Sequence, residues 1–413
     1  MILLSPKNRE LKKLIFVIVS ALLMNHLSFA QNSINTNQDL LGQRNVITTA
    51  APFLLISPDS RAAGMGDIGV ATSPDANSIH WNPAKLAFME KQAGISLSAA
   101  PWLRTLVPDV WFYYLSGYAK IGDNKRSAIA GSLRYFTLGD IQFTDEQGNP
   151  LGNYEPKEFA VDGSYSTQLS DHLSLGVALR FIFSDLARGQ VGVSGAEIKA
   201  GIAGAGDLGA FYTNDAEIGG RKFDYNIGVN LSNMGNKISY TNNAERDFIP
   251  VNFRIGTFWN TEIDEHNEIG FGIEFNKLMV PTPEYIYSYD TAGDGSVTKT
   301  ITGRVLSTDP TIKGMLSSWG DAPGGFQEEL NEFTISVGAE YWYDKQFALR
   351  AGYFHEAETK GAREYVTFGA GLKFEVFQID AAYLQPFTRR HPLQNTIRFS
   401  LLFDIDAFSN QNN

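Results

Sequence analysis

The sequence contains no cysteine and few charged residues, and both absences narrow the range of possible functions. Without cysteine the chain has no thiolate nucleophile, no cysteine-bound zinc, no iron–sulfur cluster and no disulfide. Its 413 residues include 34 basic and 45 acidic side chains, and the net charge of -11 argues against nucleic acid as a partner, which requires a basic surface. Only 19% of the residues are charged, yet 43% are hydrophobic, which is too high for a disordered chain.

Long hydrophobic runs are also absent after the N-terminus. Residues 1–30 combine a basic start, an apolar stretch at 14–24 and small residues before Gln31. This pattern predicts a secretory signal peptide, with Gln31 as the first mature residue. The apolar stretch is too short for a membrane-spanning helix, and no later segment approaches about 18 consecutive apolar residues. A mature protein in a membrane would therefore have to cross it as strands.

After residue 92 the sequence alternates between large apolar residues and small or polar ones. From 173 to 181, Leu, Val and Phe occupy every second position, with Ser, Gly, Ala and Arg between them. A period of two is the signature of a β-strand. In a soluble sheet the second face would be rich in Lys and Glu, whereas small residues dominate it here. The pattern is typical of an outer-membrane barrel with a lipid-facing and a lumen-facing side.

Counting the alternating segments supports a barrel. Fourteen strands are predicted, an even number as in bacterial single-chain barrels. They start near Ala93, Val110, Ser127, Glu158, Leu173, Ala203, Phe223, Val251, Asn267, Glu332, Phe347, Tyr365, Val376 and Asn395. Connectors after the second, fourth, eighth, tenth and twelfth strands are short and those after odd-numbered strands are mostly longer, as expected for periplasmic turns and outer loops. The predicted fold is an all-β, transmembrane antiparallel β-barrel of about 14 strands in the cell outer membrane.

The segment 31–92 does not alternate and predicts a separate hatch, or plug, inside the barrel. Its Gly-rich turn, a short helix capped near Asp75 and an Asn-Pro turn would form a compact unit. The expected organisation is a signal peptide at 1–30, an N-terminal segment and hatch at 31–92, and a barrel at 93–413. Glycines at 64–69 and 204–209 match the dinucleotide fingerprint literally, but neither match lies in a strand–helix–strand unit, so close backbone packing is favoured.

The hatch residues carry a resemblance to a known family. The chain resembles the FadL-like outer-membrane barrels, whose N-terminal hatch contains an Asn-Pro-Ala motif. Here the hatch motif comprises Gly64, Met65, Gly66, Trp81, Asn82, Pro83 and Ala84. The longer stretches 52–61, 81–85 and 101–104 are similar to the PorV family, the FadL-like components of the Bacteroidetes type IX secretion system.

This resemblance implies a role in protein export without catalysis. A member of this family is expected to dock at the translocon barrel of the type IX secretion system and to bind the C-terminal domains of secreted cargo. It would then pass the cargo to the surface attachment complex with its PorU-like sortase. Two alternatives remain open: a channel for long-chain fatty acids or other hydrophobic small molecules, lined in the hatch by Met65, Ile68 and Leu86, and, less favoured, a soluble periplasmic β-protein.

Local motifs for catalysis or metal binding are incomplete. Residues 355–359 begin like a zinc-protease motif, but Thr359 stands where the second His is required, and the segment reads as a strand end. Residues 290–296 resemble a calcium loop, but Ala292 and Ile301 fill two ligand positions, so a plain turn is favoured. We therefore predict no catalytic residue, no cofactor and no metal site.

The connector 281–331 is the longest between predicted strands. Loops of this length in ordered proteins usually have a function or are disordered. Its aromatic residues suit protein recognition and make it the candidate partner-contact loop, namely Tyr285, Tyr287, Tyr289, Trp319 and Phe326. Asp309 and Pro310 predict a short helix starting there. The alternative is that the loop folds inward and closes the lumen.

Overall fold

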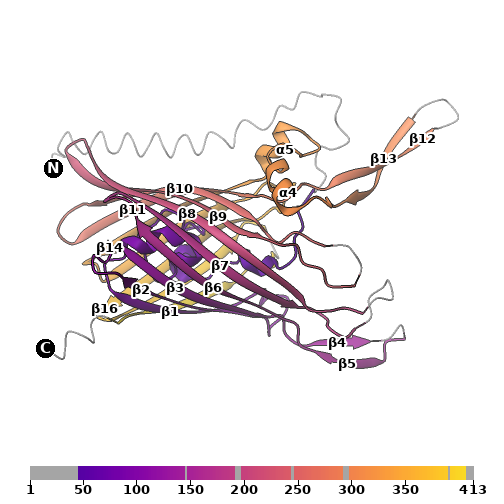
Figure 1. The fold of residues 1–413 in the computed structure, drawn as a ribbon, viewed down its shortest axis with the longest axis horizontal. Coiled ribbons are helices and arrows are strands. Elements are labelled where there is room, and N and C mark those ends of the chain that lie inside the picture. The colour runs from indigo at the N-terminus through magenta and orange to yellow at the C-terminus, as the bar shows by residue number, and fades with distance from the viewer. Residues whose placement is uncertain are drawn as a thin grey trace, which may run out of the picture. The chain divides into compact units, whose positions relative to one another are not determined.

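The computed structural model describes residues 45–144, 147–190, 197–242, 246–291, 297–388 and 391–405. Fourteen strands of this part form a closed antiparallel barrel, in which β1 pairs with both β2 and β18 (Figure 1). The barrel strands are β1 (Ala93–Pro101), β2 (Trp111–Ile121), β3 (Ser127–Thr137), β6 (Lys157–Gln168), β7 (Leu173–Asp185), β8 (Gly201–Ile218), β9 (Arg221–Gly235), β10 (Asn252–Glu262), β11 (Asn267–Leu278), β14 (Phe333–Tyr343), β15 (Phe347–His355), β16 (Glu364–Phe374), β17 (Phe377–Pro386) and β18 (Thr396–Asp404). Each predicted strand is present and starts within two residues of its predicted position, so the fold prediction is confirmed.

The two faces of the strands have opposite environments. On β7 the side chain of Leu179 is 75% exposed, whereas that of the adjacent Arg180 is 5% exposed. The outward face of the barrel is therefore apolar and the lumen is polar, which is the reverse of a soluble protein and is required of a barrel that is surrounded by lipid.

The connectors sort to the two ends of the barrel by length. One end carries only short turns in the described chain, at 122–126, 169–172, 219–220, 263–266, 344–346 and 375–376. The other end, which we call the long-loop end, carries the connectors 102–110, 138–156, 186–200, 236–251, 279–332, 356–363 and 387–395. Two extra hairpins extend from it, β4–β5 (Ile141–Thr144 and Pro150–Tyr154) and β12–β13 (Glu284–Thr291 and Val297–Val305) (Figure 1). By the asymmetry of outer-membrane barrels, the long-loop end faces outward from the cell.

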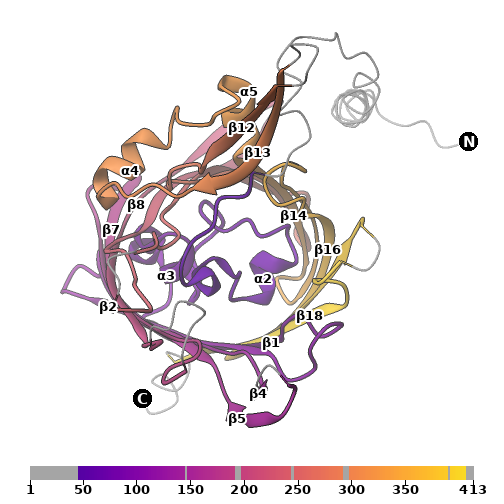
Figure 2. The same cartoon turned by 90° about the vertical axis from the view of Figure 1, so that its right-hand side faces the viewer.

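Six short helices accompany the barrel in the described part of the chain. Within the ring of strands lie η2 (Pro52–Leu55), α2 (Ser60–Ala63), α3 (Ser78–Trp81) and η3 (Pro83–Phe88), whereas α4 (Thr311–Ser317) and α5 (Phe326–Asn331) lie outside the ring (Figure 2). None of the helices in the described residues is long and apolar enough to cross a membrane. The predicted signal peptide lies outside the described residues, and the division at residues 30 and 92 stays a prediction.

Candidate functional site

The hatch is fastened by the Trp-Asn-Pro-Ala segment that the sequence singled out. Asn82 is both the C-cap of α3 and the N-cap of η3. Its side-chain oxygen accepts a hydrogen bond from the Ala84 N–H at 3.1 Å. Its Nδ2 donates to the carbonyl of Val70 in the hatch at 3.1 Å and to that of Ala210 on β8 at 2.9 Å. Pro83 occupies the first turn of η3, where no N–H is needed. One buried amide thus joins two hatch segments to the barrel wall.

Trp81 and Ala84 add two further attachments. The indole Nε1 of Trp81 donates to Asp59 Oδ2 at 2.7 Å, while Asp59 Oδ1 caps α2 by accepting from the Ala62 N–H at 2.9 Å. The Ala84 carbonyl accepts a hydrogen bond from Ser174 Oγ on β7 at 2.7 Å. Because these groups are buried, each lost partner would leave an unsatisfied polar atom.

The Gly-Met-Gly segment lies against the opposite wall. Gly66 has a φ of 72°, and a Cβ at this position would lie 2.7 Å from the carbonyl oxygen of Tyr353 on β15. A Cβ on Gly64 would lie 3.0 Å from the Cα of Gly369 on β16. The Met65 side chain between them is fully buried. Close backbone packing thus explains the glycines at 64 and 66, as the sequence analysis favoured over a dinucleotide site.

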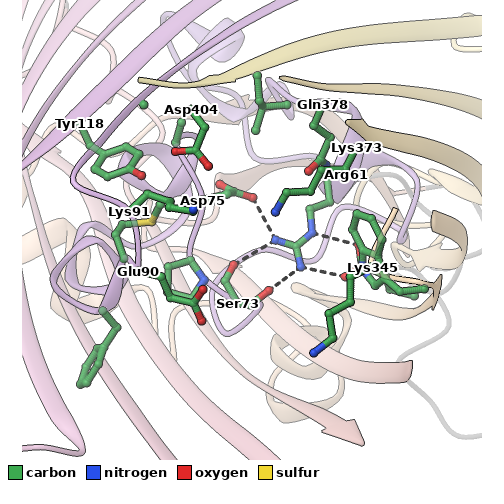
Figure 3. A pocket seen from close by; sticks show the side chains of 18 of the residues that line it. Arg61, Ser73, Asp75, Glu90, Lys91, Tyr118, Lys345, Lys373, Gln378 and Asp404 are labelled. Atoms are coloured by element: carbon green, nitrogen blue, oxygen red, sulfur yellow. Dashed lines mark hydrogen bonds and ion pairs between the residues drawn. The ribbon is translucent and has the colours of Figure 1, made fainter. Parts of the chain in front are cut away.

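An ion-pair network that sequence reasoning missed holds the hatch from the short-turn end. Arg61 of α2 donates through Nε and Nη2 to both carboxylate oxygens of Glu340 on β14, at 3.0 and 2.8 Å. Its Nη1 also pairs with Asp75 Oδ2 at 3.1 Å, and Arg350 on β15 donates to the same Glu340 at 2.6 Å. Arg61, Asp75 and Glu340 border a cavity of about 650 Å³ (Figure 3), which Lys345 and Lys373 also line.

A second network lies deeper in the lumen. Asp162 on β6 accepts hydrogen bonds from Arg134 Nη2 at 2.9 Å and from Arg180 Nε, and both arginines are buried. Arg134 also donates to the carbonyl of Leu54 in the hatch at 3.2 Å. Phe53 and Leu54 are each 1% exposed and belong to the apolar cluster that fills the outer half of the lumen. The hatch therefore contributes both charge contacts and apolar packing to the barrel interior.

The long connector does not close the lumen but folds back over the outer wall. Lys277 shares the outward face of β11 with Phe271 and Phe275, yet it is 1% exposed. The cover is α5, because Lys277 Nζ pairs with Glu329 at 3.1 Å and with Glu332. The inward fold that the sequence left open is therefore not adopted by the described part of the loop.

The candidate partner-contact residues separate into two groups. Tyr285, Tyr287 and Tyr289 belong to the β12–β13 hairpin, which extends from the long-loop end, and their side chains lie outside the described atoms (Figure 1). Trp319 and Phe326 lie instead in the part of the loop that covers the outer wall, and they are 47% and 78% exposed. The predicted helix is present as α4, one residue after Pro310.

A half-buried carboxyl in this loop makes the stability of the loop depend on pH. Burial raises the pKa of Asp321 from 3.8 to about 6, with Glu332 and Glu329 adding repulsion. The fold therefore favours the neutral form, so the contribution is fully present below about pH 4 and is lost as the pH rises through about 6. We expect amide-exchange protection of residues 306–332 to fall between pH 4 and pH 7, and we expect Asp321→Asn to remove this dependence. Identical pH profiles for the two proteins would contradict the assignment.

The structure places part of the zinc-protease-like and calcium-like segments that the sequence contains. His355 is the last residue of β15 and lies on a strand, as expected. No group of three or more His, Asp or Glu in the described residues is arranged to hold a metal. Residues 292–296 of the calcium-like loop lie outside the described part of the chain.

Comparisons with known proteins found similar solved structures and a matching family model. The fold is similar to the toluene transporter TodX of Pseudomonas putida, with 13% identity over 87% of this chain and 98% of that chain and a TM-score of 0.49. The toluene transporter TbuX of Ralstonia pickettii is 12% identical over 84% of this chain and 97% of that chain, with a TM-score of 0.46. A FadL homologue of Pseudomonas aeruginosa is 14% identical over 87% of this chain and 99% of that chain, with a TM-score of 0.41. No curated protein sequence gives a significant match.

The family model described as type IX secretion system protein PorV matches residues 39–285, more than half of the chain. The chain therefore belongs to the PorV family, as an outer-membrane component of the type IX secretion system.

Proposed function

We propose that this protein is a non-enzymatic adaptor for exported proteins at the outer face of the membrane. It would dock at the translocon barrel, bind the C-terminal domains of secreted cargo and pass them to the surface attachment complex with its PorU-like sortase. Family membership supports the secretion role. The observation that carries the adaptor role is the hatch, which lies inside the ring of strands and packs against the barrel wall, so we place partner contact at the outer loops.

The packing of the hatch argues against passage of cargo through this barrel. Ile79, Leu86 and Met65 are fully buried in clusters that contact the wall from several sides. Asn82, Arg61 and Arg134 hold the hatch to the wall at separate points. A folded domain or an extended chain would have to break all of these contacts to pass, so the working surface of an adaptor would be at the long-loop end.

The β12–β13 hairpin is the best candidate for partner contact. Its strands pair with each other over Glu284–Thr291 and Val297–Val305 and join no other strand in the described chain. Each strand therefore has one edge that pairs with no other strand of the described chain, and edges of this kind can accept an extended segment of another protein. The three tyrosines at 285, 287 and 289 occupy alternate positions along β12.

Deletion of this hairpin tests the proposal. Replacing residues 284–305 by a short Gly-Ser linker is expected to leave the barrel in the outer membrane but to abolish surface attachment of cargo, because the edge strands and tyrosines are lost. Shortening the β4–β5 hairpin at 141–154 in the same way is the matched control and should leave attachment largely intact. Normal attachment after loss of 284–305 would refute the role of the hairpin.

The alternative, a channel for hydrophobic small molecules, has less support from the hatch. The residues expected to line such a path, Met65, Ile68 and Leu86, are at most 3% exposed and pack within apolar clusters. Loss of long-chain hydrophobe uptake on gene deletion, with protein export intact, would favour the channel over the adaptor.

A further inference from the structure

The loop that covers the outer wall exposes large apolar side chains and buries acidic ones, which is the opposite of what a water-exposed loop does. Large apolar side chains on and between its two helices are exposed, and we call them the outer apolar face: Ile312, Leu316, Trp319, Phe326 and Leu330, which are 73%, 70%, 47%, 78% and 48% exposed. Residues 312 and 316 are four apart on α4, as are 326 and 330 on α5, so each pair lies on one side of its helix.

The acidic residues of α5 and the adjoining Glu332 point toward the barrel. Glu329 and Glu332 are 8% and 7% exposed and pair with Lys277 on β11. Lys360 from the 356–363 connector pairs with Glu332 at 2.9 Å and with Glu328 at 2.6 Å. The α5 part of the segment thus turns its acidic side chains inward and its apolar side chains outward, whereas the Lys313 side chain on α4 is 69% exposed.

The outer apolar face is continuous with the lipid-facing band of the barrel. The Trp319 ring contacts Phe253 on β10 at a centroid distance of 5.7 Å and Phe333 on β14 at 6.2 Å. Phe253 and Phe333 are the register partners of Lys277 on either side and share its outward face. On β10 the lipid-facing series continues from Phe253 to Ile255, which is 38% exposed. Figure 2 shows α4 and α5 outside the ring of strands, beside this wall.

We propose that the outer apolar face is a membrane-interface anchor, whose side chains contact the acyl chains of the outer leaflet. Amphipathic segments that lie in the interface bury an apolar face at the boundary between headgroups and chains, and Trp is enriched at that depth. Lipid is the occupant because the face extends a surface that lipid already covers. This role is separate from partner contact by the β12–β13 hairpin and assigns Trp319 and Phe326 to lipid.

Fluorescence of Trp319 tests the anchor. The full mature protein and its Trp319→Phe variant are reconstituted into phosphatidylcholine vesicles with or without brominated acyl chains, and the difference in emission reports Trp319. We expect brominated chains to quench this difference emission strongly and aqueous iodide to quench it weakly. The matched control is Trp342→Phe, because Trp342 on β14 lines the cavity in the lumen, and its difference emission should be insensitive to bromine.

A second variant separates lipid contact from packing on the barrel. The triple substitution Ile312→Ser, Leu316→Ser and Phe326→Ser changes only strongly exposed side chains, so the barrel should still fold. We expect the Trp319 emission to shift to the red and to become accessible to iodide in vesicles. Difference emission that iodide quenches and brominated chains do not, in the parent protein, would overturn the anchor and identify a water-exposed surface suited to a protein partner.

Discussion

Replacing Gly352 with alanine is expected to displace the hatch and to make the barrel permeable to ions. A Cβ at this position on β15 would lie well inside 3.0 Å of the Gly66 nitrogen and the Met65 carbonyl carbon. Both are backbone atoms, and Gly66 itself is confined by the Tyr353 backbone, so the strain cannot be relieved by a rotamer change. Overpacking of this kind costs about 1–3 kcal/mol.

Conductance in planar bilayers measures this effect directly, and thermal unfolding measures the accompanying loss of stability. The matched control is Gly163→Ala on β6, a barrel glycine with open space where its Cβ would be placed. We expect the control to remain closed and stable. Equal conductance and equal stability of the two variants would contradict the hatch packing described above.

Replacing Asp162 with asparagine is expected to destabilise the barrel by about 3–5 kcal/mol, because it leaves the buried Arg134 guanidinium without its anionic partner. Arg180 keeps its ion pair with Asp207 at 3.0 Å. The Asp162 side chain is 0% exposed and lies between Arg134 and Arg180. The variant should also loosen the hatch, since Arg134 donates to the Leu54 carbonyl.

The control for this substitution is an Asp–Arg ion pair that is exposed to water on the protein surface. Asp171, in a short turn, pairs with Arg126 at 2.8 Å, but its side chain is 85% exposed. Asp171→Asn should therefore change stability by about 1 kcal/mol or less. Urea unfolding of both variants in lipid vesicles compares them, and equal losses would show that burial of the network is not what matters.

The strands could be predicted from sequence because the alternation of apolar and small or polar residues is visible within each strand. Alternation along β7 and β10 is a local property, and the closed ring follows from fourteen such segments with short and long connectors in turn. The helix α4 was likewise predictable from Asp309 and Pro310, although Asp309 pairs with Lys313 at 2.9 Å instead of capping the helix.

The contacts of the hatch could not be predicted in the same way. Arg61 and Glu340 are separated by 279 positions, and their pairing depends on where the hatch sits against the strand register. Nor does alternation reveal which wall glycine faces which hatch residue, as Gly352 faces Gly66. These are long-range packing outcomes that a single sequence does not encode locally.

One signal of the covered outer wall was present in the sequence. Lys277 continues the lipid-facing series of Phe271, Ile273 and Phe275, where a bare charge would be costly in lipid. A lysine at such a position indicates that another part of the chain covers it. The residues that do so, Glu329 and Glu332, lie in the long connector whose fold could not be read from a pattern.

The central claim is that this barrel works as a component of the type IX secretion machinery and not alone. Mild detergent solubilisation of the native outer membrane, followed by affinity purification of the tagged protein, tests it most directly. We predict that a very large barrel protein or exported cargo co-purifies, and that the complex is lost when residues 284–305 are removed. A protein that purifies alone from native membranes even after cross-linking, with export unaffected by its deletion, would contradict the claim.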